Sequence, residues 1–222
     1  TKYVKVFPNC EIGFTITDST QCFKDNDFIF TNHSSIDYGS LSYFWNFGDG
    51  NTNTKDTSNN TYKLYGSYLV TLISKSDHNC LDTLTKTIKV NASPIASFTI
   101  DTARLCFRDN SFNYYNNSSI NDGSKMRFNW KLGDGVSKTD SNIINYNYAL
   151  ENSFNIELVA FSNVGCSDTT SRNVITYPQP KALFSIDNDS QCVSGNHFNF
   201  IDASFINKKD TGEITISVMA ED

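Results

Sequence analysis

The sequence has no long apolar run and no cluster of basic residues. No stretch approaches the roughly 18 apolar residues of a membrane-spanning helix, so we expect no direct insertion into a membrane. Lys and Arg number 18 against 24 Asp and Glu, which gives a net charge of -6. Nucleic acids and anionic membrane surfaces attract basic proteins, so this balance argues against both as partners.

Catalytic signatures are missing as well. The three histidines, His33, His78 and His197, have no recurring acid or nucleophile beside them. There is no Ser-His-Asp order, no HExxH and no glycine loop of the kind that cradles phosphate. No cysteines form the close CxxC pairs typical of zinc sites. We therefore expect neither catalytic residues nor a cofactor.

The sequence does contain a hexapeptide that occurs twice. Residues 45–50 read WNFGDG, and residues 130–135 read WKLGDG. Cys22, Cys106 and Cys192 recur at intervals of 84 and 86 residues. A period this long indicates tandem copies of one small domain, and tandem copies usually provide reach or valency.

This period divides the chain into four parts. They are the last strand of an upstream repeat (1–7), a first repeat (8–92), a second repeat (93–178) and a partial or divergent third repeat (179–222). In the third copy, residues 212–222 occupy the motif region without Trp or GDG, and Val218 falls roughly where Trp45 falls. We interpret the sequence as an excerpt of a longer protein.

Each repeat contains a series of short segments in which apolar residues alternate. The expected strands are 13–17, 28–32, 41–47, 61–64, 68–74 and 84–90 in the first repeat, and 97–101, 112–116, 126–132, 143–148, 154–161 and 171–177 in the second. About seven short strands at this spacing, with a central tryptophan, predict an all-β chain of tandem immunoglobulin-like β-sandwiches.

At these residues the sequence resembles the PKD (polycystic kidney disease) domain, a small β-sandwich. The family's hallmark is an aromatic residue followed by Asp/Asn-Phe-Gly-Asp-Gly, seen here as WNFGDG and WKLGDG. In the family a tyrosine and a Gly-Ser/Thr-Tyr strand opening follow, seen here at residues 65–70. The second repeat keeps Tyr146 and Tyr148 but has Asn-Ser-Phe at residues 152–154 in place of that opening. The resemblance covers about residues 13–177 and implies PKD-type sandwiches.

A hairpin of the form Gly/Asn-Cys-x-Asp-Thr, at residues 79–83 and 165–169, resembles those of very large bacterial surface proteins, including adhesins of gliding bacteria. This resemblance implies a non-enzymatic stalk or spacer at the bacterial cell surface or outside the cell, with a role in adhesion or gliding motility. Its expected partners are neighbouring repeats, cell-surface or secretion-machinery proteins, and glycans. Two alternatives stay open: a glycan- or protein-binding module, and an accessory domain of a secreted hydrolase.

The hexapeptides predict core and turn residues. We expect Trp45 and Trp130 to fill the sandwich cores rather than to stack on a ligand. The turn residues are expected to serve structure, with glycine supplying positive φ and aspartate accepting backbone N–H groups. These turn residues are Gly48, Asp49, Gly50, Gly133, Asp134 and Gly135.

Calcium is the competing interpretation for the turn aspartates. An EF-hand loop needs several oxygen ligands at alternating positions, whereas GDG offers one carboxylate. A second calcium candidate comprises Asp25, Asp27 and Asp109, near the start of the second strand of each repeat. Surface-loop chemistry explains these residues equally well, so we expect no metal.

Six cysteines at recurring positions indicate disulfides and an oxidising compartment. In an immunoglobulin-like order, Cys22 lies in the loop before the second strand and Cys80 in the hairpin before the last, at opposite ends of a sandwich. A six-residue strand spans about 20 Å, whereas a disulfide needs Cα atoms within about 7 Å. In an end-to-end array the first loop of one repeat faces the hairpin of the next, which favours Cys22–Cys166.

The competing arrangement has one bond in each repeat, Cys22–Cys80 and Cys106–Cys166. In the favoured arrangement, Cys106 needs a hairpin that the third copy lacks. Cys80 then needs an upstream partner or Cys10. Cys192 completes the set of candidates.

Overall fold

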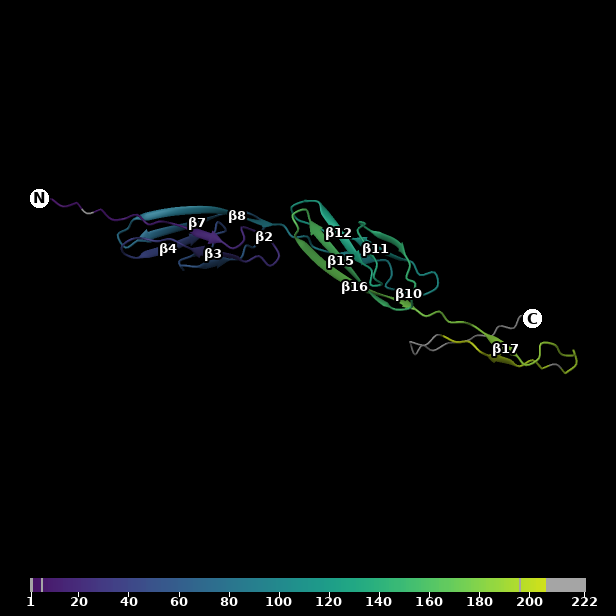
Figure 1. Ribbon diagram of the computed structural model, residues 1–222. Helices are drawn as coiled ribbons and strands as arrows, with labels where there is room; N and C mark the ends of the chain where they lie inside the picture. The colour runs from purple at the N-terminus through teal and green to yellow at the C-terminus, as the bar shows by residue number, and fades with distance from the viewer. Residues whose placement is uncertain (1, 5, 196, 207–222) are drawn as a thin grey trace. The chain divides into compact units, whose positions relative to one another are not determined.

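The computed structural model describes residues 2–4, 6–195 and 197–206 of the 222-residue chain. These residues form strands and turns, with no helix among them (Figure 1). The chain divides into two compact units. One comprises Thr1–Ala96, Ser118–Arg127 and Ala160–Asp168, and the other comprises Ser97–Asn117, Phe128–Val159 and Thr169–Asp222. The first unit therefore contains the first repeat together with three segments of the second, residues 93–96, 118–127 and 160–168.

The first repeat is a sandwich of two sheets. The smaller sheet has the order β1-β3-β6, with bounds Phe14–Ile16, Phe28–Asn32 and Ser58–Asn60. The larger sheet has the order β2-β8-β7-β4-β5, with bounds Thr20–Cys22, Leu81–Asn91, Gly66–Ser76, Leu41–Asn46 and Thr52–Asn53. All pairings are antiparallel except β2 with β8, which run parallel.

The second repeat has the same topology. Its smaller sheet has the order β14-β11-β9, with bounds Ile143–Tyr146, Phe112–Asn116 and Phe98–Ile100. Its larger sheet has the order β10-β16-β15-β12-β13, with bounds Arg104–Cys106, Ser167–Tyr177, Ser153–Ser162, Met126–Lys131 and Ser137–Lys138. The predicted all-β fold of two immunoglobulin-like sandwiches is confirmed.

Buried and exposed residues alternate along the strands, and the buried ones form the core of each repeat. In β3, Phe28 and Phe30 are fully buried whereas Ile29 between them is 40% exposed. Successive side chains of a strand point to opposite faces. The buried residues therefore share the face that packs against the other sheet. Trp45 and Trp130 are both completely buried, and each lies in the strand before the repeated turn.

Two sequence expectations about local structure are corrected. Cys22 lies in β2 rather than in a loop, because β2 pairs in parallel with the end of β8. The strand expected at residues 61–64 lies earlier, at β6 (Ser58–Asn60), where it pairs with β3. Residues 2–4, expected to be part of a strand of an upstream repeat, pair with no described strand of this chain. Their assignment to an upstream repeat stays a prediction.

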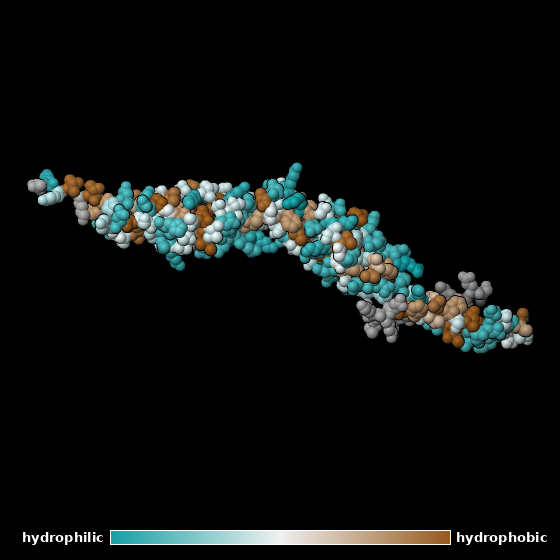
Figure 2. Space-filling model, in the orientation of Figure 1, coloured by the Kyte–Doolittle hydropathy of each residue, from teal (hydrophilic) through white to brown (hydrophobic). Residues whose placement is uncertain are grey.

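The third repeat is described up to residue 206. It has two antiparallel strands, β17 (Phe184–Ile186) and β18 (Phe200–Asp202). Phe184 and Phe200 are 66% and 53% exposed, although Phe98 and Tyr114 at the equivalent positions of the second repeat are buried. Hydrophobic side chains accordingly gather on the surface of this segment (Figure 2). Residues 212–222, including Val218, lie outside the described part of the chain.

Candidate functional site: the repeated turn and the covalent link

The first glycine of each repeated turn is required by a close approach of two backbones. Gly48 has φ +80°, and a Cβ added there would lie 2.8 Å from the carbonyl oxygen of Leu69. Gly133 has φ +83°, and a Cβ there would lie 2.8 Å from the backbone nitrogen of Asn155. A side chain at either position would be strained and would collide with the neighbouring strand.

The turn aspartates accept hydrogen bonds from groups of their own repeat. Asp49 Oδ1 accepts the backbone N–H of Asn51 at 3.0 Å, and its Oδ2 accepts the amide of Asn60 at 2.8 Å. Asp134 Oδ1 accepts the backbone N–H of Val136 at 3.0 Å, and its Oδ2 accepts the hydroxyl of Tyr146 at 2.7 Å. This is the structural role expected of a turn aspartate.

Each core tryptophan also has a polar anchor. Trp45 Nε1 donates to the carbonyl of Lys55 at 2.9 Å, and Trp130 Nε1 donates to that of Asp140 at 3.0 Å. A buried indole N–H without a partner would destabilise the fold. The two residues are therefore core components that also hold the loop after the turn.

The sequence interpretation missed a buried asparagine that recurs after 84 residues. Asn26 donates through Nδ2 to the carbonyls of Phe23 and Tyr62, at 2.8 and 3.0 Å, and its Oδ1 accepts the backbone N–H of Tyr62 at 2.8 Å. Asn110 makes the same three bonds, with Phe107 and Tyr148. The 84-residue recurrence of these asparagines was a signal that could have identified them.

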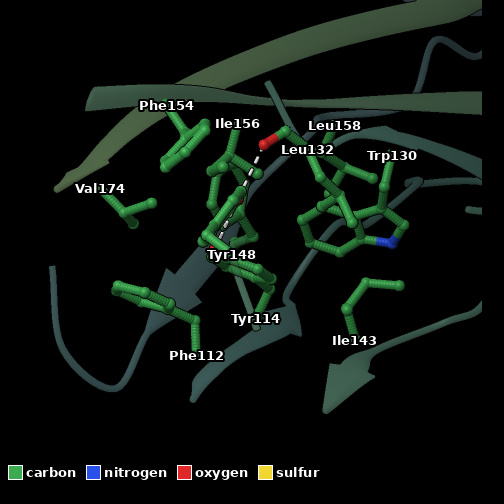
Figure 3. Close-up of a cluster of buried hydrophobic side chains, with 11 residues drawn as sticks. Phe112, Tyr114, Trp130, Leu132, Ile143, Tyr148, Phe154, Ile156, Leu158 and Val174 are labelled. Carbon is green, nitrogen blue, oxygen red and sulfur yellow. Dashed lines mark hydrogen bonds between the residues drawn. The ribbon is translucent and has the colours of Figure 1, made fainter. Parts of the chain in front are cut away.

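These asparagines position a tyrosine beneath the turn. Tyr62 donates its hydroxyl to the carbonyl of Phe47 at 2.9 Å. Tyr148 donates to the carbonyl of Leu132 at 2.7 Å, the bond drawn in Figure 3. Burial raises the pKa of Tyr62 to about 12, and burial also raises the pKa of Tyr148 above its usual value. Both phenols are therefore held neutral as structural donors.

The second calcium candidate also has a local structural role. Asp25 and Asp109 take positive φ values of 61° and 58°, in the turns that precede the two buried asparagines. Asp27 Oδ1 accepts the amide of Asn59 at 3.3 Å. Within the described residues, no group of three or more His, Cys, Asp or Glu side chains could hold a metal ion.

A covalent link joins the two repeats inside the first compact unit. Cys22 and Cys166 form a disulfide with a Cα–Cα distance of 5.6 Å. Lys24 Nζ lies 2.6 Å from Asp168 Oδ1, and Asp168 Oδ2 accepts the backbone N–H of Ala96 at 2.9 Å. The hydrogen bond and charge of Asp168 raise the pKa of Lys24. A disulfide and an ion pair thus fix the same contact.

The alternative pairing of Cys22 with Cys80 is absent for a geometric reason. Cys22 is in register with Asn91 at the end of β8, whereas Cys80 directly precedes Leu81 at its start. A strand rises about 3.3 Å per residue, so roughly 30 Å separates the two ends. Four cysteines are free thiols: Cys10 is buried, Cys80 is half-buried, and Cys106 and Cys192 are exposed.

The side chains of the repeated turn therefore hold structure, and the link holds two repeats together. None of the described segments forms a helix with the length and apolar character needed to cross a bilayer. Taken together, the two sandwiches and the link define an all-β, immunoglobulin-like tandem-repeat protein with a disulfide between its repeats.

Comparison with known proteins identifies the repeats. Two family models, both described as PKD domain, match residues 11–92 and 104–175. The chain belongs to the PKD domain family and carries two PKD domains in tandem.

Similar proteins include two from Vibrio species. A pre-pro-metalloprotease, PrtV, of Vibrio cholerae serotype O1 is 34% identical over 108 residues, which cover 47% of this chain and 11% of the relative. The crystal structure of the PKD1 domain of that metalloprotease is 31% identical, covering 39% of this chain and 99% of the domain, with a TM-score of 0.31. The PKD1 domain of Vibrio anguillarum Epp is 24% identical, covering 39% and 98%, with a TM-score of 0.35. This chain thus spans about a tenth of the length of the curated relative.

Proposed function

We propose that this chain is a non-catalytic accessory segment of a larger exported bacterial protein, in which two linked PKD domains connect and position other domains. A secreted hydrolase of the metalloprotease type is the first choice for that protein. The partners of the segment are then its neighbouring domains and the macromolecular substrate or surface on which the parent protein acts.

The observation that carries this proposal is the disulfide between Cys22 and Cys166. Structural disulfides persist in oxidising compartments, which supports an extracellular location. A bond that spans two domains adds nothing to either core, because each sandwich has its own buried tryptophan. Its effect is to restrict how one PKD domain moves against the next, as a positioning segment requires.

The similarity to a metalloprotease supports the hydrolase over the adhesin. The region of the metalloprotease that matches this chain is a small part of that protein, as expected of an accessory region. Fold alone does not determine function, so the activity of the parent protein needs a direct test.

The test is deletion of residues 11–175 from the intact parent protein. The expected result is unchanged kcat/KM for a short peptide and slower digestion of a large protein substrate, because an accessory segment acts on access rather than on chemistry. A parent protein without hydrolase activity would contradict the proposal. An equal loss with both substrates would also contradict it, because the segment would then be needed by the catalytic domain itself.

A stalk in a cell-surface adhesin is the second candidate, and the same covalent link favours it. The test compares a double variant, Cys22→Ser with Cys166→Ser, which lacks the link. Its control is Cys192→Ser, which leaves the link intact. In an adhesin, the double variant should reduce attachment of cells to a surface under flow, and the control should not. Unchanged attachment would remove this candidate.

A further inference from the structure

The covalent link consists of two half-sites. We name Cys22 with Lys24 the basic half, because β2 ends there with a thiol followed by a cation. We name Cys166 with Asp168 the acidic half, which lies at the start of β16. The disulfide and the 2.6 Å ion pair join the two halves.

A second basic half lies at the end of β10. Cys106 and Arg108 follow Cys22 and Lys24 by 84 residues. Phe107 donates its backbone N–H to the carbonyl of Tyr177 at 2.8 Å, as Phe23 does to that of Asn91 at 2.7 Å. The parallel pairing of β10 with β16 also repeats that of β2 with β8. This half therefore has the backbone geometry of the one that is joined.

The neighbouring turn is held in the same way. Asn110 Nδ2 donates to the carbonyl of Phe107 at 2.8 Å, and Asn26 does so to that of Phe23 at the same distance. Asp109 and Asp25, one residue before each asparagine, share positive φ values of 58° and 61°.

A second acidic half lies in the hairpin between β7 and β8. Cys80 and Asp82 precede Cys166 and Asp168 by 86 residues. Cys80 donates its backbone N–H to Ser76 Oγ at 3.1 Å, and its carbonyl accepts the N–H of Ser76 at 2.9 Å.

The joined hairpin has the corresponding bonds. Cys166 donates to Ser162 Oγ at 3.1 Å and accepts from the N–H of Ser162 at 2.8 Å. The second acidic half is therefore preformed as well.

Both second halves have free thiols. Cys106 and Arg108 are exposed, and Cys80 and Asp82 are half-buried. Arg108 can form two parallel hydrogen bonds with a carboxylate, where Lys24 presents a single ammonium group. The Cys106–Arg108 half and the Cys80–Asp82 half thus carry opposite charges, and each has a free thiol that can pair with the other.

We propose that the Cys106–Arg108 half and the Cys80–Asp82 half are complementary docking surfaces, and that a second copy of this chain occupies each of them, head to tail. The ion pair forms first and brings the two thiols together. A disulfide oxidant such as oxidised glutathione then accepts two electrons and two protons from Cys106 and Cys80, which become a disulfide as the glutathione leaves as two thiols. This assembly does not depend on the accessory role proposed above.

The argument for this occupant is that the link within the chain already shows how the two kinds of half fit. A lone cysteine would accept many partners, whereas a thiol two residues before a fixed charge selects a hairpin with the opposite charge at the same spacing. This chain presents such a hairpin at residues 79–83.

The experiment uses the full 222-residue chain with Cys10→Ala and Cys192→Ser, so that the remaining free thiols are Cys80 and Cys106. Treated with oxidised glutathione, this protein should give a ladder of multimers on a non-reducing gel. Further substitution by Cys80→Ser or Cys106→Ser should leave each protein monomeric when alone. An equal mixture of these two should give a single covalent dimer, with a Cys80–Cys106 peptide in its digest.

Charge reversal separates docking from random oxidation. Arg108→Glu should slow dimer formation about tenfold by removing electrostatic attraction, and Asp82→Lys on the other chain should restore it. Dimers formed equally by either single-thiol protein alone would overturn the proposal. A mixture that stays monomeric, or a Cys80–Cys106 bond within one chain, would overturn it too.

Discussion

The two PKD domains share a polar framework and differ in the side chains that fill the space around it. In both, the indole of the core tryptophan donates to a carbonyl ten residues later. In both, a buried asparagine brackets a tyrosine whose hydroxyl donates to the carbonyl just before the turn. Buried polar groups are costly unless they are satisfied, so these bonds restrict the sequence more than the apolar contacts do.

The apolar contacts vary. Where the first core pairs Phe30 with Phe47, with ring centroids 5.2 Å apart, the second has Tyr114 and Leu132. Tyr114 adds a hydroxyl 3.1 Å from that of Tyr148. Cores tolerate such exchanges when volume and patterning are kept, and this comparison shows which residues are exchangeable.

The repeats also differ by one residue in an edge strand of the smaller sheet, β6 in the first repeat and β14 in the second. In the first, Phe28 and Phe30 pair with Asn60 and Ser58 without interruption. In the second, β14 is one residue longer and the register with β11 shifts. Asn145 takes φ 55° there, as an extra residue in a β-bulge does. The bulge absorbs the insertion and leaves the turn aspartate supported in both repeats.

The largest expected effect comes from the core tryptophans. Trp45→Ala and Trp130→Ala should each reduce the free energy of unfolding by about 3–5 kcal/mol, through lost burial and a cavity. Amide hydrogen exchange of peptides from each repeat measures the two losses separately. A loss confined to the altered repeat supports independent cores. An unchanged stability would contradict the core assignment.

The next largest effect on stability comes from the turn glycines, and it should differ between the two glycines of each turn. Gly48→Ala and Gly133→Ala should cost about 3 kcal/mol each, because positive φ and a backbone collision add together. Gly50→Ala and Gly135→Ala should cost about 1 kcal/mol, since no atom lies within 4 Å of the added Cβ. Denaturant titration compares the four variants, and equal costs for both glycines of a turn would refute the close approach.

Alkaline pH should affect the second repeat more than the first. Burial raises the pKa of Tyr62 from 10.0 to about 12 in the first repeat and that of Tyr114 likewise in the second. In the second, burial also raises the pKa values of Tyr146 and Tyr148. The folded state then holds more protons than the unfolded state, so stability is full below pH 10 and falls as pH rises toward 12.

Hydrogen exchange in each repeat, measured against pH, tests this difference. Tyr114→Phe gives the second repeat the phenylalanine that the first repeat has at Phe30. It should reduce the difference in sensitivity to alkaline pH between the two repeats. Equal sensitivity of the two repeats before substitution would show that the tyrosine cluster is not its cause.

The smallest expected effect is a gain in the first repeat. Ser58 Oγ is buried without a hydrogen-bond partner, at the position opposite Phe30 where the second repeat has Ile143 opposite Tyr114. Ser58→Ala should raise the free energy of unfolding by about 1 kcal/mol, because an unsatisfied buried hydroxyl is removed. Thermal unfolding checks it, and a lower Tm would mean that the hydroxyl has a partner in solution.

The repeat period and the alternation of apolar residues were sufficient to predict the sandwich fold, the buried tryptophans and the glycine turns, because each is encoded within a few adjacent residues. The strands β2 and β10 could not be predicted, since three residues carry no alternation and their parallel pairing is a tertiary contact. For the same reason the sequence predicts a loop, rather than a strand, at Cys22. The roles of Asn26 and Asn110 depend on partners far along the chain.

The bond between Cys22 and Cys166 has a consequence for a chain that is pulled from its ends. The two residues are 144 positions apart, so tension entering at residue 22 passes to residue 166 without crossing the chain between them. Both glycine turns and both tryptophans lie in that bypassed stretch and bear no load. Once the bond is reduced, unfolding of this stretch under tension would release extended chain on the order of 500 Å, at about 3.4 Å per residue. The redox state therefore sets how far the protein can lengthen under force.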